Sequence, residues 1–124
     1  MRLLRMVDMV TVQIFGIKNS QSTRAAERFF KERRVPIQLI DLQTKPMAPA
    51  EISRFIQRFG LPGLIDTQSK SYESAGMKYL KLSEAEILAK IERDPKLLRL
   101  PLVRAGNRVS FGRDEASWKA MVDT

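Results

Sequence analysis

Apolar and polar residues alternate over residues 9–15, which is typical of a β-strand. Phe15 adds an apolar side chain to the otherwise polar face, so we expect this strand to be buried on both sides. A polar turn follows over residues 16–21, and apolar residues then recur at helical spacing over residues 22–34. Residues 37–42 predict a second strand. A strand, a helix and a strand in this order indicate a parallel βαβ unit.

The middle of the chain predicts helices. An apolar stripe over residues 49–60 indicates a second helix, with a proline at its first position and a glycine at its end. We expect residues 61–77 to form a loop with one short helical turn, because glycines interrupt the pattern. A third main helix is expected over residues 83–93, where Ser83 and Glu86 have the spacing of a capping box.

The last third of the chain predicts a hairpin and a helix. Apolar residues 102–103 and 109–111 flank a turn at residues 105–107, which indicates two antiparallel strands. A final helix begins after Asp114, a plausible N-cap, and carries Trp118 on its apolar side. The fold class is therefore α/β. The order of elements is that of a thioredoxin-like fold, a small mixed sheet of βαβ followed by a β-hairpin and α, with an inserted helical segment.

Length and composition indicate one small domain. A chain of 124 residues with 44% hydrophobic content can build a modest core. We expect a single domain over residues 9–124 after a disordered lead-in at residues 1–8. Arg5 and Asp8 interrupt the apolar residues at the start, so no signal peptide is indicated, and no stretch is long enough to span a membrane. We expect a cytoplasmic monomer without membrane contact.

Two residue types that dominate catalytic sites are missing. The chain contains no cysteine and no histidine. This excludes disulfides, thiolate metal sites and thiol nucleophiles, and it removes the usual imidazole base. We therefore expect neither a metal site nor a cofactor. The remaining hydroxyls, amines, guanidinium groups and backbone amides suit anion binding better than hydrolysis by a serine–histidine pair.

The chain is strongly basic, with 22 Lys and Arg against 14 Asp and Glu and a formal net charge of +8. This charge favours acidic protein surfaces or polyanions as partners. Arg24, Arg28 and Lys31 form a stripe on the first predicted helix, with Arg33 and Arg34 nearby. Such a stripe can meet an acidic protein face or nucleic acid, whereas the interleaved glutamates favour an ordinary solvated helix face.

Sequence-specific reading of nucleic acid is not indicated. No helix-turn-helix or zinc pattern is present, and aromatic residues make up only 7% of the chain. We assign to packing the residues Phe29, Phe30, Phe55, Phe59 and Trp118.

Four stretches in the chain resemble one family. They are FGIKNSQSTR (15–24), SKSYESAG (69–76), LLRLPLV (97–103) and VSFGRDEASW (109–118). Each is weakly specific alone, but their order and spacing together resemble the arsenate reductase and Spx family, a branch of the thioredoxin-like fold. The FGIKN turn is similar to the glutathione-linked branch, while SKSYESAG is similar to arsenate reductases and Spx. The subfamily therefore stays open.

The resemblance implies a reactive cysteine in the first loop, either alone or in a CxxC pair. The matching positions here are Ser20 and Thr23. A helix N-terminus helps to ionise a cysteine because the free thiol pKa is only about 8.5. It cannot ionise an alcohol usefully, and disulfide exchange requires sulfur at both ends of the bond. As written, the chain cannot be a thiol-based reductase.

The arginines that hold an oxyanion in the family also differ. One falls at Leu100, with Arg99 one place earlier, and another falls near Asp66, where the charge is reversed. The third could be met by Arg113 or Arg108. The departure from the family therefore includes both the attacking group and the residues that clamp the anion.

Two interpretations of the first loop stay open. In one, Ser20 or Ser22 caps the first helix, which is the common role of serine at this position. In the other, a remnant pocket still binds an anion. The candidate ligand-binding residues are Lys18, Asn19, Ser20, Gln21, Arg99, Pro101 and Arg113. The resemblance also implies a cis peptide bond between Leu100 and Pro101, opposite the first loop.

We expect a redox-inactive member of this family that acts by binding, in a regulatory or scaffold role. The expected partner is an acidic protein surface, by analogy with Spx-type proteins that dock on RNA polymerase. The alternative is a thiol-dependent reductase, for arsenate or glutathione-linked substrates, whose nucleophilic cysteine is replaced by Ser20.

Overall fold

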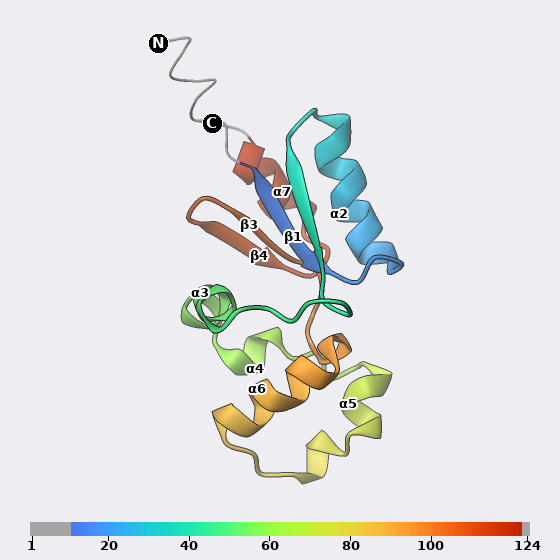
Figure 1. The fold of residues 1–124 in the computed structure, drawn as a ribbon, viewed down its shortest axis with the longest axis vertical. Coiled ribbons are helices and arrows are strands. Elements are labelled where there is room, and N and C mark those ends of the chain that lie inside the picture. The colour runs from blue at the N-terminus through green and yellow to red at the C-terminus, as the bar shows by residue number, and fades with distance from the viewer. Residues whose placement is uncertain (1–10, 123–124) are drawn as a thin grey trace.

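A computed structural model of the chain describes residues 11–122. It contains a four-stranded sheet of β1 (Val12–Gly16), β2 (Ile37–Asp41), β3 (Leu102–Ala105) and β4 (Arg108–Phe111), in the order β2-β1-β3-β4 (Figure 1). β1 and β2 are parallel, whereas β1 with β3 and β3 with β4 are antiparallel. The mixed sheet expected from the sequence is therefore confirmed. The expected lead-in at residues 1–8 lies outside the described residues.

The βαβ unit consists of β1 (Val12–Gly16), α2 (Gln21–Glu32) and β2 (Ile37–Asp41). The first two residues of the predicted strand, at positions 9 and 10, lie outside the described part. β1 is buried on both sides, as expected, because it lies between two other strands and under helices on both faces.

α2 ends slightly earlier than the sequence predicts. The expected end was near Arg34, but the helix stops at Glu32 and Arg33 is its C-cap. Arg34 has a positive φ of 57°, which a helix cannot contain, and its backbone N–H donates to the carbonyl of Lys31 at 2.9 Å. The chain then continues in extended form into β2.

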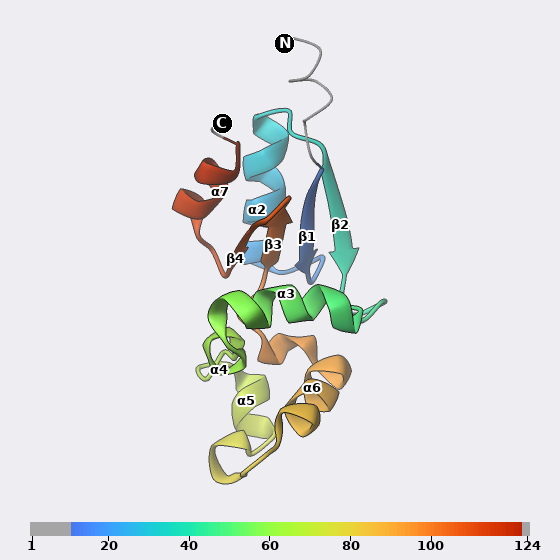
Figure 2. The same cartoon turned by 90° about the vertical axis from the view of Figure 1, so that its left-hand side faces the viewer.

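One face of the sheet is covered by α2 and α7 (Glu115–Val122) (Figure 2). Phe29 and Phe30 of α2 pack around Trp118 of α7, with ring centroids 5.5 Å and 6.1 Å from the indole. All three rings are buried. Asp114 caps α7 as expected, because its carboxylate accepts hydrogen bonds from the backbone and hydroxyl of Ser117.

The other face is partly covered by α3 (Pro49–Phe59), which lies across the lower end of the strands (Figure 2). Phe55 meets Phe15 of β1 edge to face at 6.0 Å, and Phe59 meets Phe111 at 4.8 Å. Such aromatic pairs contribute about 0.5–1.5 kcal/mol each beyond their buried area. The five aromatic residues assigned to packing from the sequence do pack in the core.

The segment over residues 61–77 corrects the prediction of a loop with one helical turn. It contains two short helices, α4 (Leu61–Leu64) and α5 (Lys70–Ser74), and a 3₁₀ turn, η1 (Met77–Tyr79), begins at its end. The cap of α5 is Ser69, whose hydroxyl accepts from the backbone of Tyr72. Single turns of this kind depend on caps and on buried side chains, so they leave no periodic pattern in the sequence.

The third main helix, α6 (Glu84–Arg93), begins with the predicted capping box. The backbone and hydroxyl of Ser83 both bond Glu86, and these hydrogen bonds lower the pKa of the Glu86 carboxyl. A second 3₁₀ turn, η2 (Pro95–Leu97), follows and was not predicted. Among the described residues, no helix combines the length and the hydropathy that crossing a bilayer requires.

The hairpin forms as predicted. β3 (Leu102–Ala105) and β4 (Arg108–Phe111) pair in antiparallel register through a turn in which Gly106 has a φ of 62°. This is a left-handed conformation that glycine adopts without steric strain. The hairpin places Arg104 on the same sheet face as α3 and Val103 on the face of α2.

Candidate functional site

The candidate site is the loop between β1 and α2. β1 ends at Gly16, where an added Cβ would collide with the side chain of Thr23. Glycine at this position therefore lets the first turn of α2 pack directly on the end of the strand. This close packing fixes how the residues of the loop, 17–20, approach the helix N-terminus.

The structure shows Ser20 as the N-cap of α2. Its Oγ accepts a hydrogen bond from the backbone N–H of Thr23 at 3.1 Å and donates one to Thr23 Oγ1 at 2.8 Å. Thr23 is fully buried, and its Oγ1 also accepts from the backbone N–H of Ile17 at 3.2 Å. The two residues at the cysteine positions of the family thus bond each other. The interpretation of Ser20 as a cap is confirmed.

Ser22 has a different role from Ser20. Its hydroxyl donates to the carbonyl of Leu100 at 3.2 Å, which joins the first turn of α2 to the segment before β3. The Leu100–Pro101 peptide bond is cis, as the resemblance implied, and Pro101 is buried. The backbone N–H of Gly112 holds this segment by donating to the carbonyls of Arg99 and Pro101.

The other candidate ligand-binding residues do not form a closed pocket with Ser20 in this structure. Lys18, Asn19 and Gln21 are exposed. Within residues 11–122, the side chains of Arg99 and Arg113 form no hydrogen bond or ion pair with residues of the loop, and Arg113 pairs with Glu115 at 3.5 Å. That these residues form an anion-binding site therefore stays a prediction.

The three positions where oxyanion-holding arginines were sought serve local structure. Leu100 is half-buried and packs against the apolar cluster to which α3 and α6 contribute. Asp66 closes a turn by accepting from the backbone N–H of Gln68 at 3.1 Å. Arg108 donates to the carbonyl of Ala120 near the end of α7, which is favourable at a helix C-terminus.

The loop therefore offers hydroxyls but no imidazole that could activate them. An alcohol needs a neighbouring base to become a nucleophile, and the chain has no histidine. Within the described residues, no three Asp, Glu, His or Cys side chains gather as metal ligands. The hydrogen bonds in this loop join it to the first turn of α2.

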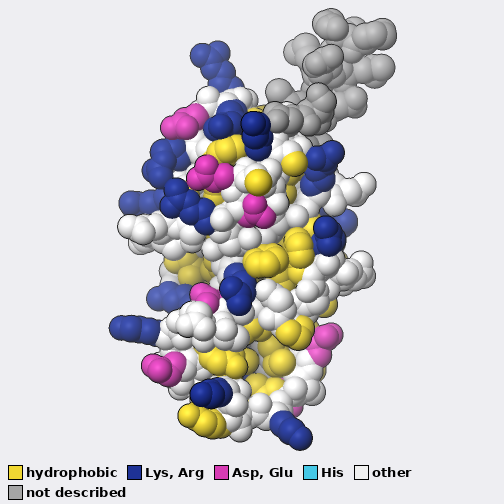
Figure 3. Space-filling view, turned by 180° about the vertical axis from the view of Figure 1, so that it is seen from behind, with side chains coloured by type: hydrophobic (Ala, Val, Ile, Leu, Met, Phe, Trp, Pro, Cys, Tyr) yellow, Lys and Arg dark blue, Asp and Glu magenta, His cyan; other side chains and the backbone are white. Residues whose placement is uncertain are grey.

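The basic stripe of α2 is exposed and only partly paired. Lys31 lies 3.7 Å from Glu27, and the Arg33 guanidinium lies 3.6 Å from the ring centre of Phe29. Within residues 11–122, Arg24 and Arg28 have no carboxylate within ion-pair distance. Figure 3 shows Lys and Arg side chains along the side of the molecule on which α2 lies. The stripe therefore carries positive charges without ion-pair partners, and such charges attract acidic surfaces.

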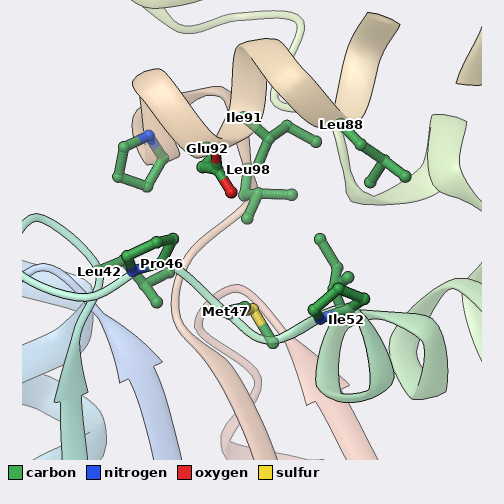
Figure 4. A pocket seen from close by; sticks show the side chains of 10 residues that line it. Leu42, Pro46, Met47, Ile52, Leu88, Ile91, Glu92 and Leu98 are labelled. Carbon is green, nitrogen blue, oxygen red and sulfur yellow. The ribbon is translucent and has the colours of Figure 1, made fainter. Parts of the chain in front are cut away.

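Sequence reasoning missed three hollows. An apolar one of about 120 Å³ lies between the chain after β2 and α6, with Leu42 and Met47 facing Leu88 and Ile91 and with Glu92 beside them (Figure 4). A second of about 460 Å³ lies beside α4 and α5. The third, of about 300 Å³, lies between α3 and the hairpin. The first and the third join segments that are distant in the sequence, whereas the second is lined entirely by residues 61–87.

Comparison with known proteins identifies the family of this chain. The model of the ArsC family matches residues 15–121. The global transcriptional regulator Spx of Streptococcus pneumoniae is 25% identical over 113 residues, covering 90% of this chain and 85% of that protein. Spx of Lactiplantibacillus plantarum is 26% identical over 106 residues, covering 84% and 80%.

Solved structures share the fold. An arsenate reductase from Vibrio cholerae superposes with a TM-score of 0.77 at 17% identity, covering 91% of this chain and 98% of that one. An arsenate reductase related protein from Brucella melitensis gives 0.62 at 15% identity, covering 92% and 96%. The fold is therefore thioredoxin-like, with helices inserted between the βαβ unit and the hairpin.

Proposed function

The chain belongs to the ArsC family, and from this premise we propose that it acts by binding a protein partner, as a regulator or scaffold, rather than by thiol chemistry. The observation that carries the proposal is the pair of hydroxyls at the family's cysteine positions. Ser20 and Thr23 bond each other at 2.8 Å in a chain that has no cysteine. A loop closed in this way stabilises the fold but holds no sulfur to accept or donate electrons.

The partner we propose is RNA polymerase, through an acidic part of its surface. The curated relatives are named global transcriptional regulators, and this role in transcription is the basis of the analogy. The net charge of +8 supports an acidic partner, because opposite charge raises the rate of encounter. The exposed stripe on α2 provides free arginines for such a contact.

Binding to purified RNA polymerase of the same host tests this proposal by biolayer interferometry. The wild-type chain should bind saturably at about 50 mM salt and more weakly at about 300 mM, because salt screens exposed charges. Arg24→Glu combined with Arg28→Glu should weaken binding at least about tenfold, since two attractive charges become repulsive.

The matched control carries the same charge change on another helix, Arg54→Glu with Arg58→Glu on α3. Both pairs are exposed and spaced by four residues, so the two double variants differ only in place. Binding that falls in the α2 variant alone supports contact through the stripe. Absence of any binding by the wild-type chain at low salt contradicts the proposal.

The second candidate is a reductase that has lost its nucleophile, and one observation favours it. The surroundings of the reactive position persist: Ser20 is at the helix N-terminus, and the segment of Leu100 and Pro101 lies beside it through Ser22. The substitution Ser20→Cys should then give a thiol with a pKa below the usual value of about 8.5, as measured by the pH dependence of alkylation.

Arsenate turnover by the Ser20→Cys variant decides whether this scaffold still supports the reaction. Turnover by that variant, with none by the wild-type chain, would place the chain among reductases whose nucleophile was lost. No turnover despite an acidic thiol would show that the departures at Leu100 and Asp66 also matter, and the binding role would stand.

A further inference from the structure

The hollow between α3 and the hairpin is lined by three arginines from two separate elements. Arg54 and Arg58 lie one turn apart on α3, and Arg104 of β3 also lines the hollow, which has a volume of about 300 Å³. None of its lining residues is acidic. The other lining residues are Gln57, Gly106, Asn107 and Val109.

The positive charge of this hollow is not neutralised by the protein. Within residues 11–122, no carboxylate oxygen lies within 4.0 Å of any of the three guanidinium groups. The lining segments themselves explain this, because residues 52–65 and 95–113 contain no Asp or Glu. Three cations that share a hollow without a counter-charge repel one another, and an anion placed among them removes that repulsion.

The nearest carboxylate along α3 has another role. Glu51 precedes Arg54 by three residues, a spacing at which side chains on a helix can meet. Its Oε1 instead accepts the backbone N–H of Ala48 at 3.1 Å, at the start of α3. The hollow is thus left without the one acidic side chain that could have paired with its arginines from the same helix.

Arg104 is held in place before any ligand arrives. Its Nε donates to the carbonyl of Gly106 at 2.9 Å, and its Nη1 donates to Gln13 Oε1 at 3.0 Å. Gln13 is fixed in turn by donating to Gln38 on the neighbouring strand. Both acceptors are uncharged, so they orient the guanidinium while its full charge remains. A pre-oriented arginine loses less conformational freedom when it binds an anion.

We propose that Arg54, Arg58 and Arg104 form a binding site for a phosphate group of a small molecule. Guanidinium groups match the oxygens of phosphate in geometry and charge, and several donors can converge on one such group. Val109 supplies an apolar side against which an organic body could lie. This site is separate from the loop at the start of α2 and does not depend on the protein partner proposed above.

Nuclear magnetic resonance titration of the ¹⁵N-labelled chain tests the site with three probes: inorganic pyrophosphate, AMP and adenosine. Pyrophosphate and AMP should shift the amide signals of Gln57, Gly106 and Asn107, and adenosine should not. The dissociation constant should lie below about 1 mM at about 50 mM salt. AMP that binds tighter than pyrophosphate indicates a nucleotide, and the reverse order indicates a free phosphate compound.

Two double variants locate the binding. Arg54→Gln with Arg58→Gln should weaken pyrophosphate binding at least about tenfold, because two charge-assisted contacts are lost. Arg24→Gln with Arg28→Gln removes the same charge from an exposed pair on α2 and should change the affinity less than about twofold. Both pairs are exposed, so neither change should prevent folding.

Three results would overturn the proposal. One is the absence of binding by the wild-type chain at millimolar pyrophosphate. Another is equal weakening in the two double variants, which would mean diffuse attraction to a basic protein. The third is a set of shifts centred on Ser20 and Gln21, which would place the anion at the start of α2.

The affinity for AMP should also rise from pH 5 to pH 8, because a phosphate monoester gains its second charge near pH 6 while arginine stays charged.

Discussion

Polar side chains lie close together both in the loop before α2 and in the hollow beside α3. In the loop they form hydrogen bonds with one another, whereas within residues 11–122 the arginines of the hollow have no carboxylate partner. At the loop, Ser20, Thr23 and the backbone of Ile17 satisfy one another, and the centre is buried. At the hollow, Arg54 and Arg58 are exposed and have no carboxylate partner within the described residues, and the Arg58 guanidinium lies 5.2 Å from the ring centre of Phe59. Groups that bond each other contribute to stability, whereas charges without partners remain available to a ligand.

This difference predicts that substitutions at the loop change stability and that substitutions at the hollow do not. The free energy of unfolding, measured by urea denaturation at one pH and salt concentration, can test each case.

Gly16→Ala should have the largest effect. An added Cβ would collide with the Thr23 side chain, so the strand or the first turn of α2 must shift. We expect a loss of about 3 kcal/mol, the upper part of the usual range for overpacking a core. Gly63→Ala is the control, because the nearest atom to its added Cβ lies 4.0 Å away. Equal losses in the two variants would contradict the close packing at Gly16.

Thr23→Val keeps the shape of the buried side chain and removes its hydroxyl. The backbone N–H of Ile17 and the hydroxyl of Ser20 then lose their acceptor. An unsatisfied buried donor costs about 1–3 kcal/mol, and we expect a loss in that range. The control Thr67→Val removes an exposed hydroxyl and should be close to neutral. A neutral result for Thr23→Val would mean that the hydroxyl pair does not stabilise the loop.

Ser20→Ala removes the N-cap of α2. The backbone N–H of Thr23 loses its acceptor at the start of the helix, and such a change costs about 1 kcal/mol. Ser22→Ala, which leaves the cap intact, should cost less. If Ser22→Ala proves the more damaging of the two, the assignment of the cap is wrong.

Arg54→Gln with Arg58→Gln should leave the free energy of unfolding unchanged within about 0.5 kcal/mol, as exposed substitutions usually do. Any change should be a gain of about 0.2–0.5 kcal/mol, because like charges at this helical spacing repel each other. A clear loss of stability would show that these arginines hold the fold together, and the contrast between the two regions would disappear.

The regular elements could be predicted because their signals are local. Ser83 and Glu86 mark the start of α6 by their spacing alone, and Asp114 does the same for α7. The short helices between residues 61 and 77 could not be predicted, because each is about a single turn and only α5 has a side-chain cap, Ser69. The cis bond before Pro101 followed from resemblance to a family and not from the residues themselves.

The candidate site was predicted only in part. A serine at position 20 before an apolar helix suggests a cap, and the structure confirms it. That Thr23 would be fully buried and bonded to Ile17 depends on the approach of the helix to Gly16, which no sequence pattern specifies. The arginine hollow requires Arg104 of the hairpin to lie on the sheet face that α3 covers. Only the tertiary structure brings these segments together.

We expect the purified wild-type chain of this ArsC family member not to accelerate the reduction of arsenate by glutathione, because its proposed role involves no redox chemistry. Hydroxyls stand at the family's cysteine positions, Ser20 and Thr23, and the chain contains no thiol. The rate of arsenate reduction should therefore equal that of a reaction without protein. A rate that rises in proportion to the concentration of the chain would contradict the account.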